Sequence, residues 1–229
     1  FRRVADAVVG GRAGRRDHRI IIPEGKREEF AEHCQRLVAE RYPDLNNGDY
    51  TAVIDQRSYD RLQGALEDAR SKGAKIVNLA PKQQPDAGRR IMAPHLVFDL
   101  TEDMVLAQRE IFGPIMPVRT YKNCEDVARH VNGQDRPLAF YPFTNDRALQ
   151  RYYISHVMSG GVSINEGLLH LAQHDLPFGG VGPSGMGHYH SKEGFITFSK
   201  LRPVFKQGQL SGIQMFFQPP YAGRAMKLM

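Results

Sequence analysis

Residues 18–43 read HRIIIPEGKREEFAEHCQRLVAERYP, a short β-branched run followed by a charged stretch with regularly spaced apolar residues. The run at 18–22 is closed by Pro23 and predicts a buried strand. Apolar side chains then recur at helical spacing within 28–41, which predicts a helix. They are Phe30, Cys34, Leu37 and Val38. A strand therefore leads directly into a helix.

The same alternation continues along the chain. Further strands are expected at 75–79, 91–98, 115–121, 138–143 and 161–164, and further helices at 55–72, 123–133 and 146–157. Pro94 favours an edge position for its strand, whereas Asn123 is expected to cap a helix that Gly133 ends. This pattern predicts an α/β fold with a mostly parallel sheet and helices on both faces.

Beyond a glycine-rich stretch that ends at Gly187, a short helix (188–195) and a strand (197–205) are expected to lead into a tail. We place a boundary near Gly187. The stretch contains a literal GxGxxG at 180–185. It follows a loop rather than a strand, and no acidic residue lies about 20 positions on, so a tight structural turn is favoured over a dinucleotide fingerprint.

Composition excludes several classes of protein. The chain has 229 residues, of which 41% are hydrophobic and 24% charged, as in a soluble globular protein. Charges interrupt every apolar stretch, so no transmembrane helix is expected, and the tail at 213–220 is too short for stable membrane insertion. The net charge is +6, but basic residues cluster only at the N-terminus, which argues against nucleic acid.

Residues 1–19 are rich in arginine and poor in acids, which loosely matches a transit peptide. The favoured interpretation is that the chain begins inside a longer protein. Two distant cysteines, Cys34 and Cys124, cannot build a disulfide framework or a cysteine zinc site, which fits a reducing cytoplasm.

Other candidate reactive groups are isolated in the sequence. Cys34 is expected to be an inert core residue. A helix dipole at Asn123 would favour the Cys124 thiolate, but nothing nearby supplies a base, so a reactive Cys124 is not the favoured interpretation. His170 and His174 have a helix-like i,i+4 spacing, but without further ligands nearby no metal site is expected. If the segment at 110–112 is extended, Glu110 and Phe112 point to one face and could hold a ribose. On pattern alone, a surface acid and a core phenylalanine are favoured.

Taken together and in order, three stretches resemble the C-terminal half of aldehyde dehydrogenases: EIFGP at 110–114, SGGVSIN at 159–165 and LPFGGVGPSGMGHYHSKEGFITFSK at 176–200. The last block is similar to the class 3 branch, and most similar to coniferyl aldehyde dehydrogenases. The resemblance runs from Ile20 to Phe205. It implies a divergent or disrupted remnant at 1–19, a catalytic domain at 20–187, and a C-terminal helix, oligomerisation strand and tail at 188–229.

The resemblance also implies roles for individual residues. Glu110 corresponds to the carboxylate that binds the nicotinamide ribose of NAD or NADP, with Phe112 beside the nicotinamide. Asn165 opens the segment that shapes the substrate site. Phe178 and Gly179 line and close the substrate tunnel.

The family's cysteine nucleophile corresponds to Gly14, or to Ala13 with a one-residue slip, and neither has a nucleophilic side chain. The resemblance thus implies an oxidoreductase by descent that oxidises aromatic, coniferyl-type aldehydes, works as a homodimer and is inactive as this chain alone. The alternative is a non-catalytic dimerising fragment, or a partner of an intact aldehyde dehydrogenase.

Overall fold

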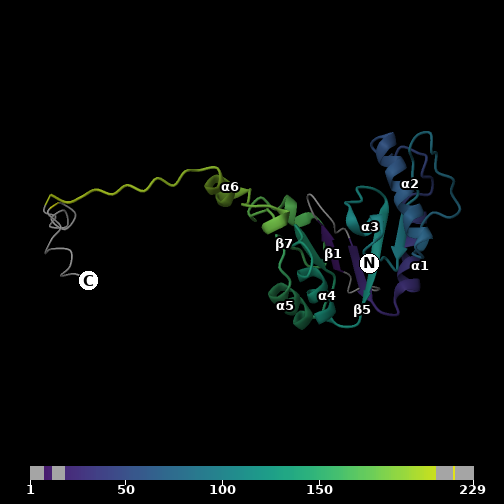
Figure 1. The fold of residues 1–229 in the computed structure, drawn as a ribbon, viewed down its shortest axis with the longest axis horizontal. Helices are drawn as coiled ribbons and strands as arrows, with labels where there is room; N and C mark the ends of the chain where they lie inside the picture. The colour runs from purple at the N-terminus through teal and green to yellow at the C-terminus, as the bar shows by residue number, and fades with distance from the viewer. Residues whose placement is uncertain (1–7, 12–18, 210–218, 220–229) are drawn as a thin grey trace. The chain divides into compact units, whose positions relative to one another are not determined.

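The computed structural model describes residues 8–11, 19–209 and 219. The chain divides into two compact units, Phe1–Thr197 and Phe198–Met229, and each is described by itself. Figure 1 draws the first unit as a sheet with helices packed against it. Gly187, where the sequence suggests a boundary, lies inside the first unit.

In the described part of the first unit, seven strands form one sheet in the order β3-β4-β5-β2-β1-β6-β7. The strands are β1 (Val8–Gly11), β2 (Arg19–Pro23), β3 (Lys75–Asn78), β4 (His95–Phe98), β5 (Ile115–Tyr121), β6 (Ala139–Pro142) and β7 (Gly161–Val162). All run in one direction except β1, which is antiparallel to both of its neighbours, and β3, which is antiparallel to β4. The sheet is therefore mostly parallel, which confirms the predicted fold class.

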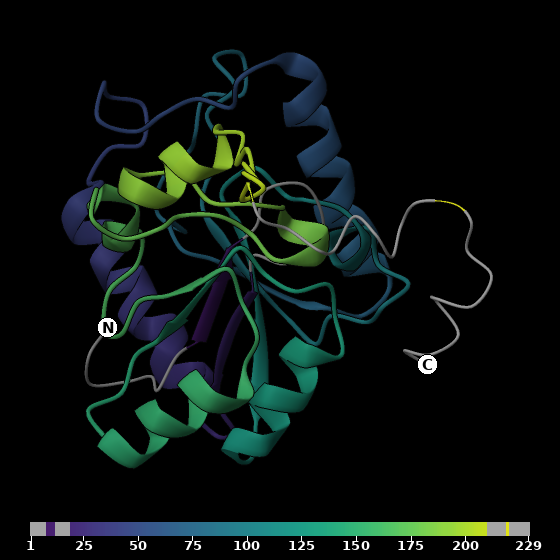
Figure 2. The ribbon, with the colours of Figure 1, turned by 90° about the vertical axis from the view of Figure 1, so that its left-hand side faces the viewer.

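Helices cover both faces of this sheet. They are α1 (Arg27–Arg41), α2 (Gln56–Ser71), α3 (Val105–Gln108), α4 (Cys124–Asn132) and α5 (Arg147–His156). Ile20 and Ile22 of β2 pack with α1, whereas Ile21 packs with α4 and α5. Because successive side chains of a strand point to opposite faces, α1 lies across the sheet from α4 and α5. Figures 1 and 2 both draw α4 and α5 side by side.

The helices α2 and α3 share the face of α4 and α5. Val97 of β4 belongs to the core cluster formed with α2 and α3. It pairs with Pro117 of β5, while Ile21 pairs with Arg119 two residues further along the same strand. Residues two apart on a strand point to the same side, so Val97 and Ile21 face the same helical layer.

Two helix boundaries follow the sequence signals. Asp55 caps α2 by accepting a hydrogen bond from Ser58 N at 2.7 Å, and Asn123 caps α4 by accepting one from Asp126 N at 2.9 Å. Gly73 follows α2 with a backbone φ of +89°, a conformation that glycine adopts without steric cost. The predicted start and end of α4 are confirmed.

The edge position suggested by Pro94 is wrong. β4 lies between β3 and β5 and pairs with both. Pro94 immediately precedes β4, and its carbonyl accepts a hydrogen bond from Leu79 N at 2.9 Å. Because Pro94 precedes the first residue of the strand, the sheet needs no N–H donor at this position. The proline is therefore compatible with an internal strand.

The C-terminal part of the first unit contains η1 (Leu169–Ala172), η2 (Gly182–Ser184) and α6 (Ser191–Thr197). The GxGxxG segment forms the tight turn that the sequence favours. Gly182 has φ +61°, and a Cβ added at Gly180 would collide with the Ser184 carbonyl. Glycine is needed here for a close backbone approach rather than for a phosphate.

The strand expected at 197–205 is not formed. Thr197 ends α6, and residues 200–208 have no regular structure. A strand is stable only when its backbone pairs with a neighbour, and none of the described residues of the second unit offers one. Its hydrophobic side chains are highly exposed: Phe198 (88%), Leu201 (78%), Val204 (78%) and Phe205 (89%).

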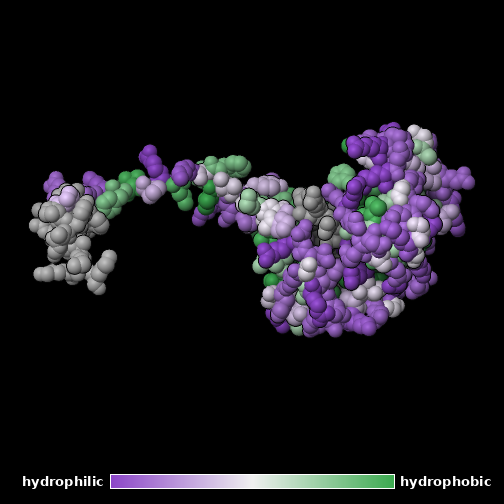
Figure 3. Space-filling view, in the orientation of Figure 1, coloured by the Kyte–Doolittle hydropathy of each residue, from purple (hydrophilic) through white to green (hydrophobic). Residues whose placement is uncertain are grey.

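Figure 3 shows hydrophobic residues recurring along this segment. The face of the first unit in the same view is mainly hydrophilic. Among the described residues, no helix is both long enough and apolar enough to cross a bilayer.

Candidate functional site

Glu110 and Phe112 lie on the loop that joins α3 to the amino end of β5. Between them, Ile111 is buried in the core at 5% exposure. Phe112 has a backbone φ of +47°, and its side chain is 73% exposed. The segment is therefore not extended at Phe112, because a left-handed residue turns the chain. The pattern's core position for Phe112 is wrong, since the side chain is exposed.

The helix α2 holds this loop in place. Arg61 donates from Nη2 to the Ile111 carbonyl at 2.7 Å and from Nη1 to the Glu110 carbonyl at 3.3 Å. The neighbouring Leu62 packs so closely on Gly113 that a Cβ at this glycine would collide with Leu62 Cδ1. The role of Arg61 was not predicted from the sequence. An arginine beside the buried face of a helix looks the same in the sequence whether it contacts solvent or a distant loop.

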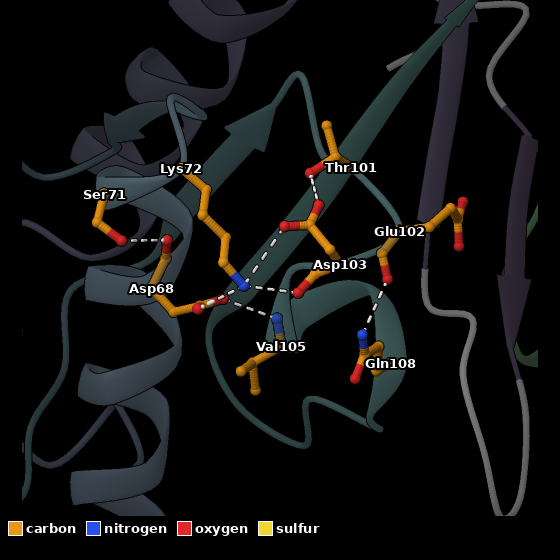
Figure 4. Close-up of polar contacts among 8 residues, drawn as sticks. All are labelled: Asp68, Ser71, Lys72, Thr101, Glu102, Asp103, Val105 and Gln108. Carbon is orange, nitrogen blue, oxygen red and sulfur yellow. Dashed lines mark hydrogen bonds and ion pairs between the residues drawn. The ribbon is translucent and has the colours of Figure 1, made fainter.

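A polar network, shown in Figure 4, holds the segment before α3 against the same helix. Lys72 Nζ forms an ion pair with Asp68 Oδ1 at 2.8 Å and donates to the Asp103 carbonyl at 2.6 Å. Asp68 Oδ2 accepts from Val105 N, the first residue of α3, at 2.8 Å. The hydrogen bond with Lys72 lowers the pKa of Asp68, and the same bond raises the pKa of Lys72. The start of α3 and the loop that follows α3 are thus both tied to α2.

A pocket of about 300 Å³ opens beside Phe112. Its walls are mainly apolar and come from β2, the 111–113 loop and β5. The residues are Arg19, Ile20, Ile111, Phe112, Gly113, Ile115 and Met116. An apolar pocket of this size with one cation in its lining can hold a flat aromatic ring.

Asn165 lies after β7 with a backbone φ of +58°. Its amide N–H donates to the Pro142 carbonyl at 2.9 Å, and its side-chain Nδ2 donates to the Thr144 carbonyl at 3.0 Å. The side chain therefore fixes the turn that leaves β6. Asparagine suits this position because it adopts the left-handed region more readily than most residues.

Phe178 and Gly179 lie in a compact aromatic turn. Phe178 exchanges backbone hydrogen bonds with Tyr189, and its ring lies 5.4 Å from the Tyr189 ring and 5.6 Å from the His170 ring. A Cβ at Gly179 would collide with the Gly187 carbonyl. Gly179 is therefore required for the turn to close.

These expected site residues lie at two opposite edges of the sheet, one where the parallel strands begin and the other where they end. Gly160 packs against both the Gly179 and the Leu138 carbonyls, which places Gly179 at the amino end of β6. Glu110 lies at the amino end of β5, and β5 and β6 run in the same direction. Gly179 and Glu110 thus share an edge, with β2 and β1 between their strands. Asn165 lies at the other edge, beside the carboxyl end of β6.

Neither cysteine has the properties of a nucleophile. Cys34 is buried in the α1 core, and burial raises its pKa to about 11, which confirms an inert thiol. Cys124 also has a raised pKa, first through desolvation and then through Glu125, and these effects outweigh the lowering effect of the backbone hydrogen bonds at the helix start. Gly14 and Ala13, the expected nucleophile positions, lie outside the described residues.

The histidines do not form the helical pair that their spacing suggests. His170 lies in η1, which ends at Ala172, so His174 follows it outside the helix. Desolvation lowers the pKa of His170, whose ring packs 5.5 Å from Tyr141. Among residues 19–209, no group of three or more His, Cys, Asp or Glu side chains could hold a metal ion.

Comparisons with known proteins agree on one family. Its sequence profile, described as the aldehyde dehydrogenase family, matches residues 13–204. The chain is 44% identical over 210 residues to a "probable coniferyl aldehyde dehydrogenase" of Pseudomonas aeruginosa, covering 91% of this chain and 43% of that protein. It is 35% identical over 213 residues to aldehyde dehydrogenase family 3 member B1 of Rattus norvegicus, covering 92% of this chain and 44% of that protein.

Structural similarity points the same way. A substrate-bound structure of Staphylococcus aureus AldH superposes with a TM-score of 0.72 at 32% identity, covering 91% of this chain and 44% of that one. The chain therefore spans less than half the length of the relatives that it matches. Together with the mostly parallel α/β sheet, these similarities establish that the chain belongs to the aldehyde dehydrogenase family.

Proposed function

We propose that this chain forms one wall of an active site that oxidises aldehydes to carboxylic acids with NAD or NADP. The observation that carries the proposal is the 109–114 loop, which Arg61 holds beside an apolar pocket of about 300 Å³. Family membership supplies the reaction class. The pocket supplies a place where a cofactor ring fits.

The residues of this loop suit a nicotinamide nucleoside. The exposed Phe112 ring can pack against the flat nicotinamide, with Ile111 and Ile115 behind it. The Glu110 carboxylate can accept hydrogen bonds from ribose hydroxyls. When bound, the nicotinamide ring accepts the hydride that leaves the aldehyde carbon.

The chemistry also needs a thiolate to attack the aldehyde. Cys34 is enclosed in the core, and Cys124 follows the carboxyl end of β5, a seven-residue strand whose other end carries Phe112. At about 3.3 Å per residue, roughly 20 Å separates the two ends. We therefore propose that this chain does not turn over aldehydes alone and depends on a thiolate from a complementary segment.

Coniferyl-type aromatic aldehydes are the proposed substrates. The proposal is supported by the name of the Pseudomonas relative and by the aromatic turn at Phe178 and Tyr189. Aromatic side chains favour flat, apolar ligands through edge and face contacts. Aliphatic aldehydes are expected to be poorer substrates.

We further propose that residues 198–205 pair with a second subunit in a homodimer. Phe198 and Phe205 are almost fully exposed, and burial of such side chains stabilises an interface by roughly 25 cal/mol per Å². A partner edge would supply a neighbouring strand, which the described residues of its own unit do not provide. Light scattering of the chain and of a truncation after Thr197 distinguishes a dimer from a monomer.

Complementation tests the catalytic proposal. The chain is co-expressed with the N-terminal segment of the Pseudomonas relative, extended through the position that matches Arg19 so that it includes the expected place of the cysteine nucleophile, and NAD(P)H formation is followed with coniferyl aldehyde. We expect turnover by the pair and none by the chain alone. Glu110→Gln is expected to raise the KM for the cofactor about tenfold, since one charge-assisted hydrogen bond is lost.

Glu40→Gln is the matched control, because Glu40 is an exposed carboxylate on α1. It should leave turnover unchanged. Co-purification without turnover would reject the catalytic proposal and favour a non-catalytic partner. Turnover by the unmixed chain would instead contradict the need for a complementary thiolate.

A further inference from the structure

A second pocket, of about 310 Å³, lies at the opposite edge of the sheet from Phe112. It opens between the carboxyl ends of β2 and β5 and the side of α4. We call it the carboxyl-edge pocket. Its charged and titratable lining residues are Glu24, Arg119, Tyr121, Lys122, Asp126, Arg129 and His130. None of them belongs to the proposed active site.

The charges in this pocket are not balanced pair by pair. Asp126 accepts from Arg129 Nη1 at 2.9 Å and from the Lys122 backbone N–H at 3.2 Å, so its carboxylate is already engaged. Among residues 19–209, no carboxylate forms an ion pair with the side chains of Arg119 or Lys122. Two cationic side chains are therefore left facing the same space as the carboxylate of Glu24.

The pKa of His130 reflects the same excess of positive charge. It is half-buried on the pocket side of α4, and its pKa is lowered to about 4, first by desolvation and then by the charges of Arg119 and Arg19. Arg19 is buried at 7% exposure on β2. The neutral imidazole can therefore donate one hydrogen bond into the pocket without adding charge.

We propose that the carboxyl-edge pocket binds the phosphate group of a small phosphate monoester through Arg119, Lys122 and His130. A phosphate accepts hydrogen bonds on three oxygens and is mostly dianionic near neutral pH, which suits a pocket lined by three donor side chains. The pocket is larger than a bare phosphate ion. Glu24 is placed to accept from a hydroxyl of the esterified alcohol, so glycerol phosphate should bind more tightly than inorganic phosphate.

Histidine NMR of the intact chain tests the site without any catalytic readout. The His130 ring signal, assigned with His130→Gln, is followed during titration with inorganic phosphate and then glycerol phosphate at constant pH and ionic strength. We expect a saturable shift and, because a bound anion favours the imidazolium, a higher His130 pKa in phosphate. Arg119→Gln and Lys122→Gln should each weaken binding about tenfold.

Arg151→Gln is the matched control, since Arg151 is an exposed arginine on α5 outside the pocket. It should bind phosphate as the parent chain does. An unmoved His130 signal, an equal shift with chloride, or equal binding by the Arg119 and Lys122 variants would overturn the proposal. If only one of the Arg119 and Lys122 variants folds, the phosphate affinity of that variant tests the proposal. The result is independent of aldehyde oxidation, so each proposal can fail without the other.

Discussion

Arg61 Nη2 lies 2.7 Å from the carbonyl oxygen of Ile111, fifty positions along the chain. This contact fixes the backbone between Glu110 and Phe112, the two residues that we expect to face the cofactor. Without it, the Ile111 carbonyl would need another donor where its side chain is buried. The orientation of the loop thus depends on one guanidinium from α2.

Arg61→Ala is therefore expected to loosen this loop. Loss of a charge-assisted donor should cost about 1–2 kcal/mol of unfolding free energy and speed amide exchange at residues 111–113. Arg61→Lys should recover part of both effects. Urea unfolding and hydrogen exchange measure them, with Arg57→Ala, an exposed arginine of the same helix, as control. Equal exchange in parent and Arg61→Ala would show that the loop is held by packing alone.

Two glycines that look alike in sequence should respond in opposite ways to alanine. At Gly113 an added Cβ would collide with Leu62, so Gly113→Ala should destabilise by about 1–3 kcal/mol. At Gly64, exposed within α2, a Cβ meets nothing within 4 Å, and Gly64→Ala should stabilise by about 0.5–1 kcal/mol. Chemical denaturation of both variants gives the comparison. Similar losses at the two positions would contradict the observed packing of Leu62.

His130 should make the fold sensitive to mild acid. Its folded pKa is lowered from 6.5 to about 4, so between these values the unfolded chain binds more protons than the folded chain. Stability should therefore fall as pH drops from 6.5 to about 4. After allowance for partial exposure, the loss is on the order of 2 kcal/mol. His130→Gln should reduce the slope of unfolding free energy against pH in this range, and bound phosphate should do the same. An unchanged slope in the variant would show that other groups cause the pH dependence.

The two thiols should differ in accessibility while both react slowly at neutral pH. Cys34 has a pKa raised to about 11 by burial, and the pKa of Cys124 is also raised. A thiol reagent should modify Cys124 first and reach Cys34 only when α1 separates from the sheet. Mass spectrometry of Cys124→Ser, which leaves Cys34, tests this order. Rapid labelling of that variant under native conditions would contradict a buried Cys34.

Local sequence signals accounted for most elements of the fold. β5 begins at Ile115 and ends at Tyr121 as predicted, and α4 begins after Asn123. In both cases the signal lies within the element itself, as strand-forming residues or a capping side chain. Predictions failed where a distant partner decides. Pro94 cannot reveal that β3 will cover its strand, and the 197–205 segment cannot become a strand without a neighbour.

The site shows the same division. The EIFGP residues at 110–114 are recognisable in the sequence, yet the left-handed φ of Phe112 depends on Arg61 and Leu62 of a helix that the chain reaches fifty residues earlier. The raised pKa of Cys124 likewise depends on its surroundings and not on its place at a helix start. Periodicity therefore determined the α/β class, and the resemblance of the motifs at 110–114, 159–165 and 176–200 indicated the family. Only tertiary packing decided at which end of the strands each site residue lies, and which cations among residues 19–209 have no carboxylate partner there. Burial and charge pairing arise between segments that the sequence does not place together.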